Sequence, residues 1–174
     1  MKVTILGCGG SGGVPLMGPH WGECNPDNPK NRRRRVSIAL RQNTIMGETT
    51  ILVDTSPDLR AQCLDAGIAQ VSAILYTHDH ADHTQGIDDA RFLKKPAGQA
   101  TIPAYGTRET LAVLTSRFQY IFQQNTEGSG HLYKPFMRAE EVTGPLTIDG
   151  IPVVAFWTAS VGEAIGHVET LPLS

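Results

Sequence analysis

The sequence has few cysteines and no long hydrophobic run, and neither sign of charge dominates it. Its three cysteines, Cys8, Cys24 and Cys63, stand far apart without a C-x-x-C pair, so disulfides are not expected and the expected location is cytoplasmic. No stretch reaches the ~20 apolar residues of a membrane span, and the N-terminus lacks the pattern of a signal peptide. No membrane partner is therefore expected. The net charge of −2 disfavours nucleic acid as a partner.

The composition is that of an ordinary soluble globular protein, with 40% hydrophobic and 18% charged residues. A chain of 174 residues is one domain or a large part of one, and it can bury roughly 70% of its unfolded surface. No repeat, linker or low-complexity tract divides it. We therefore expect a single domain over residues 1–174.

Apolar runs bounded by turn residues predict strands and helices in alternation. The expected strands are 3–6, 36–41, 51–53, 73–76 and 102–105, followed by a hairpin of 145–148 and 151–154 around Asp149-Gly150. The expected helices run from Ser56, as N-cap, to Gly67, and over 107–122. A mobile loop is expected at 123–135. The alternation favours a layered α/β architecture.

The strongest chemical signal is His78-Asp79-His80-Ala81-Asp82-His83, which directly follows the expected strand 73–76. Imidazole and carboxylate are the usual ligands of zinc, manganese and Fe(II). His78 and His80 can supply one ion, and Asp82 and His83 a second. Two such ions ~3.5–4 Å apart can activate a shared water and polarise a phosphoryl or carbonyl oxygen, which is the chemistry of hydrolysis. The alternatives are a structural metal site and a solvated polar loop.

Two further segments are candidates for holding a substrate phosphate. The glycine loop after the first strand, with Gly10, Ser11 and Gly12, can present backbone N–H groups to an anion. Arg33 and Arg35, in a run of four arginines, can form guanidinium forks with phosphate oxygens. Each segment also has a purely structural interpretation: a tight turn that needs glycine, and a solvated charged edge.

The His-x-His-x-Asp-His pattern after a hydrophobic strand resembles the signature of the metallo-β-lactamase-fold superfamily. Residues 3–15, 31–37, 51–60 and 86–91 are similar to its phosphodiesterase branch, which includes RNase Z and the cyclic ribose-phosphate phosphodiesterase of phosphonate breakdown. The resemblance covers about residues 1–155. It implies the N-terminal part of an αββα sandwich.

The resemblance also implies roles for single residues. His78, His80, Asp82 and His83 would bind two divalent ions, zinc or manganese, with iron as a third option. Asp82 would also accept a proton from the attacking water. Asp54 would hold a ligand histidine or a loop amide in place; the alternative is an Asp that caps the turn before Ser56.

The chain departs from the superfamily pattern in its last third. Relatives add a histidine after the central hairpin, a bridging Asp and a final histidine, and this chain stops at Ser174, before the last two. The third ligand position falls on Ile165, and His167 is a candidate substitute. We therefore expect an incomplete domain, with a sheet face that a homodimer can cover.

The function expected from these observations is a metal-dependent phosphodiesterase acting on a small cyclic or nucleotide-like phosphate. One alternative is a truncated, non-catalytic or weakly active remnant of the fold. Another is a thioester or lactone hydrolase of the same fold. RNA processing is disfavoured because the chain is not basic and lacks an extended substrate-clamping arm.

Overall fold

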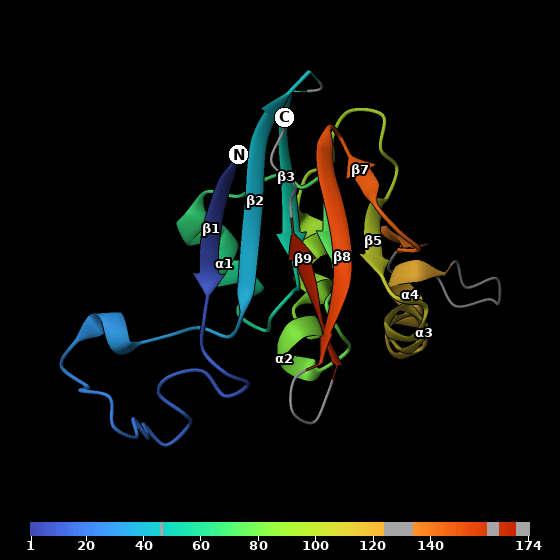
Figure 1. Cartoon of the computed structure of the whole chain (residues 1–174). Coiled ribbons are helices and arrows are strands. Elements are labelled where there is room, and N and C mark those ends of the chain that lie inside the picture. The colour runs from blue at the N-terminus through green and yellow to red at the C-terminus, as the bar shows by residue number, and fades with distance from the viewer. Residues whose placement is uncertain (46, 124–133, 160–163, 170–174) are drawn as a thin grey trace.

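The computed structural model describes residues 1–45, 47–123, 134–159 and 164–169, with side chains up to residue 155. The chain forms two β-sheets (Figure 1). The larger sheet has the order β1-β2-β3-β4-β5-β6, and the smaller has the order β7-β8-β9. Strands β1 to β3 are antiparallel, and β3 to β6 are parallel. The expected α/β class is therefore confirmed.

The strands of the larger sheet are β1 (Lys2–Gly7), β2 (Ser37–Thr44), β3 (Gly47–Val53), β4 (Ala73–Leu75), β5 (Ile102–Gly106) and β6 (Met137–Glu141). Those of the smaller sheet are β7 (Leu146–Ile148), β8 (Ile151–Ala159) and β9 (Ala164–Glu169). The helices are α1 (Leu59–Ala66), α2 (Ala81–Thr84), α3 (Arg108–Arg117) and α4 (Gln119–Phe122), with 3₁₀ turns at Pro29–Asn31 and Ile87–Phe92.

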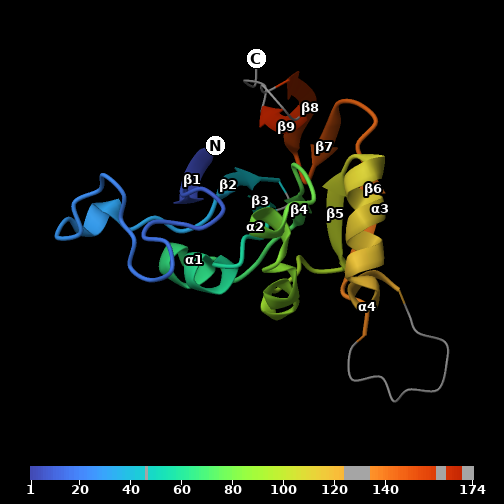
Figure 2. The same cartoon turned by 90° about the horizontal axis from the view of Figure 1, so that it is seen from below.

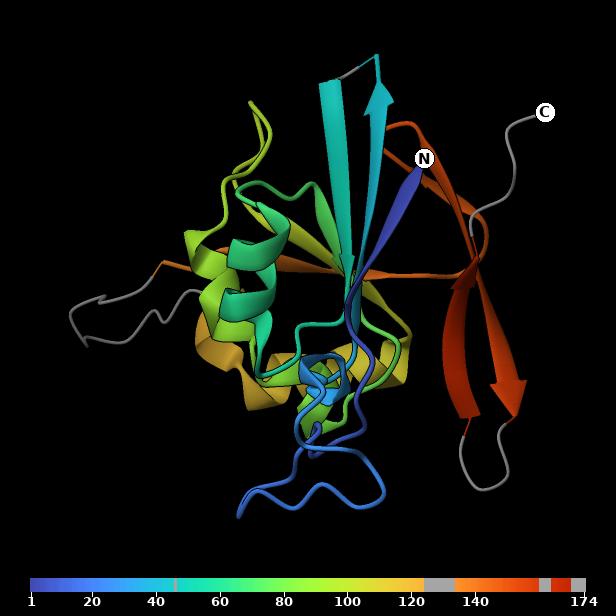
Figure 3. The same ribbon diagram turned by 90° about the vertical axis from the view of Figure 1, so that its left-hand side faces the viewer.

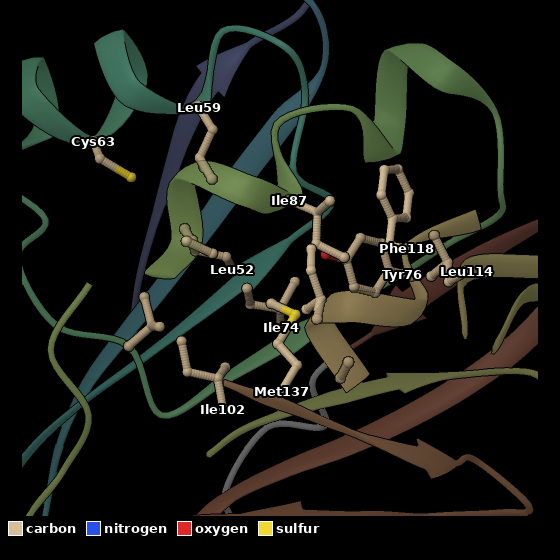
Figure 4. Packing of buried hydrophobic residues seen from close by; sticks show 14 of the residues in the cluster. Leu52, Leu59, Cys63, Ile74, Tyr76, Ile87, Ile102, Leu114, Phe118 and Met137 are labelled. Carbon is tan, nitrogen blue, oxygen red and sulfur yellow. The ribbon is translucent and has the colours of Figure 1, made fainter. Parts of the chain in front are cut away.

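Side-chain alternation along the central strands produces three layers (Figures 2 and 3). Leu52 and Ile74 face the helices and join the larger core, which also contains Leu59 of α1 and Leu114 of α3 (Figure 4). Ile51 and its neighbours on the opposite face pack against β7 and β8 in a second core. Both faces of the central strands are therefore buried, as continuous apolar runs predict.

The smaller sheet leaves β1 uncovered at the edge of the larger sheet (Figure 1). Val3 and Ile5 pair with Leu40 and Ile38, which belong to or pack against the core between the sheets. Val3 is nevertheless 54% exposed and Ile5 69% exposed. Two apolar side chains of the edge strand are thus exposed, whereas β7 and β8 cover the middle of the sheet. The homodimer expected to cover a sheet face stays a prediction.

Two helix predictions need correction. The first helix begins at Leu59 rather than directly after Ser56, because the Leu59 N–H bonds to the Ser56 carbonyl and closes a turn first. The Ser56 hydroxyl accepts from the Asp58 N–H within this turn. The second helix is interrupted at Phe118 (φ −119°, ψ 43°), where the aromatic ring is buried in the core.

Other local predictions are confirmed. Gly67 ends α1 in the left-handed conformation, with φ 62°, and Asp149 and Gly150 form the hairpin turn with φ 46° and 87°. The predicted loop 123–135 falls mostly outside the described residues. Among the described helices, none has the length and apolar character needed to cross a membrane.

Candidate metal centre

The histidine motif lies where two neighbouring parallel strands end. Asp54 directly follows β3, and Thr77 and His78 follow β4, which pairs with β3 in parallel register. The carboxyl ends of parallel strands meet at one edge of a sheet, so these residues become neighbours despite their separation in sequence. The motif then continues into the single turn of α2, near the point where β1 leads into the glycine loop (Figure 1).

Asp54 is buried next to the motif and contacts both Thr77 and His83. Its side chain accepts from the Thr77 N–H at Oδ1 (2.9 Å) and from the Thr77 hydroxyl at Oδ2 (2.8 Å). Asp54 Oδ2 also lies 2.7 Å from His83 Nδ1. A carboxylate at Nδ1 keeps a proton there and leaves Nε2 as the lone-pair donor, which is the usual arrangement behind a metal-binding histidine. Asp54 thus holds both a histidine and a loop amide.

The backbone of Asp54 has a positive φ of 61°, although the residue is not glycine. Such conformations cost about 1–3 kcal/mol for most residues and persist where the surroundings enforce them. Here the Asp54 N–H bonds to the Leu75 carbonyl at 2.8 Å and fixes the residue against β4. The conformation turns the carboxylate toward the histidine motif.

The three imidazoles of the motif gather in front of Asp54. The ring centroid of His78 lies 4.0 Å from that of His83 and 4.5 Å from that of His80. Asp82 Oδ2 lies 3.5 Å from His83 Nε2. The structure therefore brings all four predicted ligands into one cluster.

The surroundings shift the pKa values of two histidines of this cluster in opposite directions. Burial lowers the pKa of His78, and the neighbouring His83 and His80 lower it further. Burial also acts to lower the pKa of His83, but the hydrogen bond to Asp54 and the charges of Asp54 and Asp82 outweigh it, so this pKa is raised. A neutral His78 is available as a metal ligand near pH 7.

The donor set has the chemistry of a zinc, manganese or iron site, with imidazole nitrogens, one carboxylate and a further carboxylate behind a histidine. Within the described part of the chain, however, no three His, Cys, Asp or Glu side chains converge closely enough to hold an ion as they stand. The residues fit such ions by the chemistry of their donor atoms and by the proximity of the imidazole rings. His167 lies on β9, and its side chain is outside the described residues.

The arginine run and the glycine loop border a cavity of about 680 Å³, and the four predicted metal ligands are not among its lining residues. Gly12, Arg33 and Arg35 line it, whereas Gly10 and Ser11 are not among its lining residues. Gly7 lets the two segments approach, because a Cβ there would lie 2.0 Å from the Arg35 carbonyl oxygen. The glycine loop thus has a structural role in close packing, alongside any contact with an anion.

Arg35 is already engaged in an ion pair. Its Nε and Nη2 donate to the two oxygens of Asp58 at 2.8 and 2.7 Å. The hydrogen bond with Asp58 and the charges of Asp58 and Asp82 raise the pKa of Arg35 although burial opposes them. In the described residues no carboxylate pairs with Arg33, so Arg33 has the more available charge of the two.

Sequence reasoning missed several residues that contact the motif, among them Thr77, Thr84 and Arg117. Thr77 bonds to Asp54, and its hydroxyl lies 3.0 Å from His78 Nδ1; its position next to His78 was a usable signal. Arg117, at the end of α3, donates to the Asp79 carbonyl. Nothing in the sequence links Arg117 to a motif 38 residues earlier.

Comparison with known proteins identifies the family. The family model described as "Beta-lactamase superfamily domain" matches residues 49–168, and the chain belongs to this family. Its fold is that of the metallo-β-lactamase-fold hydrolases, as a crystal structure of a diphosphatase from the PhnP family shows. That structure has a TM-score of 0.78 and 30% identity over 97% of this chain and 61% of its own. The resemblance inferred from the motifs is confirmed.

Two other relatives extend the comparison. The Zn²⁺-bound PqqB of Methylobacterium extorquens has the same fold, with a TM-score of 0.66 and 20% identity, over 98% of this chain and 59% of its own. An octanoyltransferase of Porphyromonas gingivalis (strain ATCC BAA-308 / W83) is 34% identical over 173 residues, which is 94% of this chain and 33% of that protein. The chain therefore spans about one third of that relative and about three fifths of the two solved structures.

Proposed function

We propose that the chain is a metal-dependent phosphodiesterase whose two divalent ions are held by His78, His80, Asp82 and His83. The observation that carries this proposal is the cluster itself: three imidazoles with ring centroids 4.0 and 4.5 Å apart, with Asp54 Oδ2 2.7 Å from His83 Nδ1. Such a cluster of basic nitrogens offers lone pairs that a divalent cation satisfies. The zinc named for PqqB makes zinc the first metal to test, before manganese and iron.

The chain's own residues have separable tasks in this proposal. Bound divalent ions lower the pKa of a water and polarise a phosphoryl oxygen. Asp54 keeps the proton of His83 on Nδ1, so that Nε2 faces the site. Asp82, whose Oδ2 lies 3.5 Å from His83 Nε2, accepts a proton of the attacking water. The Thr77 hydroxyl donates to the same oxygen, Asp54 Oδ2, and the Thr77 N–H donates to Oδ1, so Thr77 holds the carboxylate in place.

The cavity bordered by the arginine run supports a phosphate-containing substrate. Lys30, Arg32 and Arg33 line it, and among the described residues none of the three pairs with a carboxylate. A cleft lined by cations that no carboxylate neutralises attracts anions, and the Arg32 guanidinium is held over the Trp21 ring. Its volume of about 680 Å³ suits a nucleotide-sized ligand, which fits a small cyclic or nucleotide-like phosphate. The name diphosphatase, given to the relative from the PhnP family, is consistent with phosphate chemistry.

Hydrolysis of bis-p-nitrophenyl phosphate by the zinc- or manganese-loaded chain tests the proposal. We expect turnover that EDTA abolishes, and a loss of at least about 100-fold in His80→Ala. His20→Ala is the matched control, because His20 lies in the exposed segment after β1. Turnover of thioesters or lactones without phosphodiesters would assign the site to that other hydrolase class. Fewer than about one bound metal per chain, without turnover, would identify a non-catalytic remnant.

A further inference from the structure

We propose that Arg117 is a positioning residue of the metal centre, which fixes the peptide between His78 and His80 and so sets the spacing of these two ligands. This inference rests on the proposed function, because it concerns how the same cluster is held. Arg117 is the last residue of α3 and belongs to a different part of the chain from the motif.

The contacts of Arg117 are directed at one residue of the motif. Its Nη1 donates to the Asp79 carbonyl oxygen at 2.6 Å, and its Nη2 donates to Asp79 Oδ2 at 3.2 Å. Nη1 also lies 3.4 Å from the hydroxyl of Thr84. The planar guanidinium therefore donates hydrogen bonds to both the backbone and the side chain of Asp79. A lysine ammonium cannot reproduce this geometry.

Asp79 stands between the two histidines, so the orientation of its peptide determines where their side chains point. The next carbonyl is also held, because the Thr84 hydroxyl donates to the His80 carbonyl oxygen at 2.9 Å. The two rings lie with centroids 4.5 Å apart and an interplanar angle of 71°. Contacts from α2 and α3 thus fix two consecutive carbonyls of a segment that has no other regular structure before α2 begins at Ala81.

A positioning role of Arg117 and a role of its charge alone predict opposite effects of its removal on metal affinity. A guanidinium near a divalent cation repels it, so an arginine that acted only through its charge would weaken metal binding, and its removal would strengthen it. An arginine that acts by holding the Asp79 peptide has the reverse effect. Loss of residues that orient metal ligands typically costs 10–100-fold in metal affinity.

The experiment measures the zinc affinity of the metal-free chain by competition with a chromophoric chelator. The variants are Arg117→Ala and Arg117→Lys. The matched control is Arg108→Ala, which removes an arginine from the other end of the same helix, where it pairs with Glu141. Thermal unfolding of each metal-free variant reports whether the fold is retained. The kinetic constants of bis-p-nitrophenyl phosphate hydrolysis provide a second readout.

We expect Arg117→Ala to bind zinc 10–100-fold more weakly, Arg117→Lys to remain weaker than wild type although its charge is kept, and Arg108→Ala to bind as wild type does. In turnover we expect kcat to fall with KM unchanged. Equal or tighter zinc binding by Arg117→Ala overturns the inference, as does an equal loss in Arg108→Ala. If Arg117→Ala does not fold, wild-type affinity in Arg117→Lys overturns it instead.

The two proposals fail in different ways. A wild-type chain that binds no zinc refutes the proposed function, and the role of Arg117 falls with it. A wild-type chain that binds zinc but hydrolyses no phosphodiester refutes the proposed substrate alone, and the affinities of the Arg117 variants still decide the positioning role. Equal zinc affinities in all variants of an active enzyme refute the positioning role alone.

Discussion

Replacing Asp54 by Asn removes the acceptor that keeps the His83 proton on Nδ1, while the volume of the side chain hardly changes. The amide oxygen can still accept from the Thr77 N–H, as Asp54 Oδ1 does at 2.9 Å. The amide NH₂ then faces His83 Nδ1, where Oδ2 stood at 2.7 Å. The ring therefore shifts its proton to Nε2, and the lone pair that should face the metal is lost.

The magnitude follows from this contact. Loss of a carboxylate behind a ligand histidine typically lowers metal affinity 10–100-fold, which is about 1.4–2.7 kcal/mol. The metal-free protein also loses a charge-assisted hydrogen bond at a site that is 2% exposed, at a cost of roughly 1.5–3 kcal/mol. The backbone adds no new strain, since Asn adopts a positive φ more readily than most residues.

Zinc affinity of Asp54→Asn, measured by chelator competition, and thermal unfolding of the metal-free chain together test this reasoning. Asp149→Asn is the matched control, because Asp149 is the other described non-glycine residue with a positive φ (46°) and lies in a hairpin turn away from the cluster. Wild-type zinc affinity in Asp54→Asn would refute the role of Asp54. A comparable loss in Asp149→Asn would show that the effect is not specific to the site.

The remaining predictions concern stability. Gly7→Ala should destabilise the chain by at least about 2 kcal/mol in urea unfolding, because its Cβ would lie 2.0 Å from a carbonyl oxygen; Gly10→Ala, which meets nothing within 4 Å, should not. Leu52→Ala, at 0% exposure, should cost about 2–5 kcal/mol, and a smaller loss would contradict its central position in the core. The hydrogen bond from Arg35 lowers the pKa of Asp58 below 3.8, so its stabilisation is present above pH 3.8 and disappears as the pH falls through the lowered pKa. The stability difference between wild type and Asp58→Asn should therefore shrink on acidification, and a difference independent of pH would contradict this.

The sequence was sufficient to predict the parts of the molecule that depend on local patterns. Continuous apolar runs marked the buried strands, and Asp149-Gly150 marked its turn because few residue pairs accept two positive φ angles. The position of Asp54 at the end of a strand was also readable, since parallel neighbours bring their carboxyl ends together. These features follow from local backbone geometry and from the regular spacing of apolar side chains along a strand or helix.

The features that were missed depend on contacts between distant segments. The helical pattern is interrupted at Phe118, whose ring is buried in the larger core. Arg35 was a candidate phosphate ligand, but its guanidinium forms a two-point ion pair with Asp58, 23 residues later in the sequence. Arg117 reaches the motif only because the fold brings the end of α3 within hydrogen-bonding reach of Asp79. Local sequence carries no signal for which carboxylate or carbonyl a long basic side chain will meet.

A crystal structure of the chain grown with zinc or manganese, with the ions located by anomalous scattering, tests the metal centre most directly. We expect two ions, one held by His78 and His80 and the other by Asp82 and His83, with Asp54 still bonded to His83 Nδ1. Four side chains that remain without an ion in excess metal would contradict this expectation.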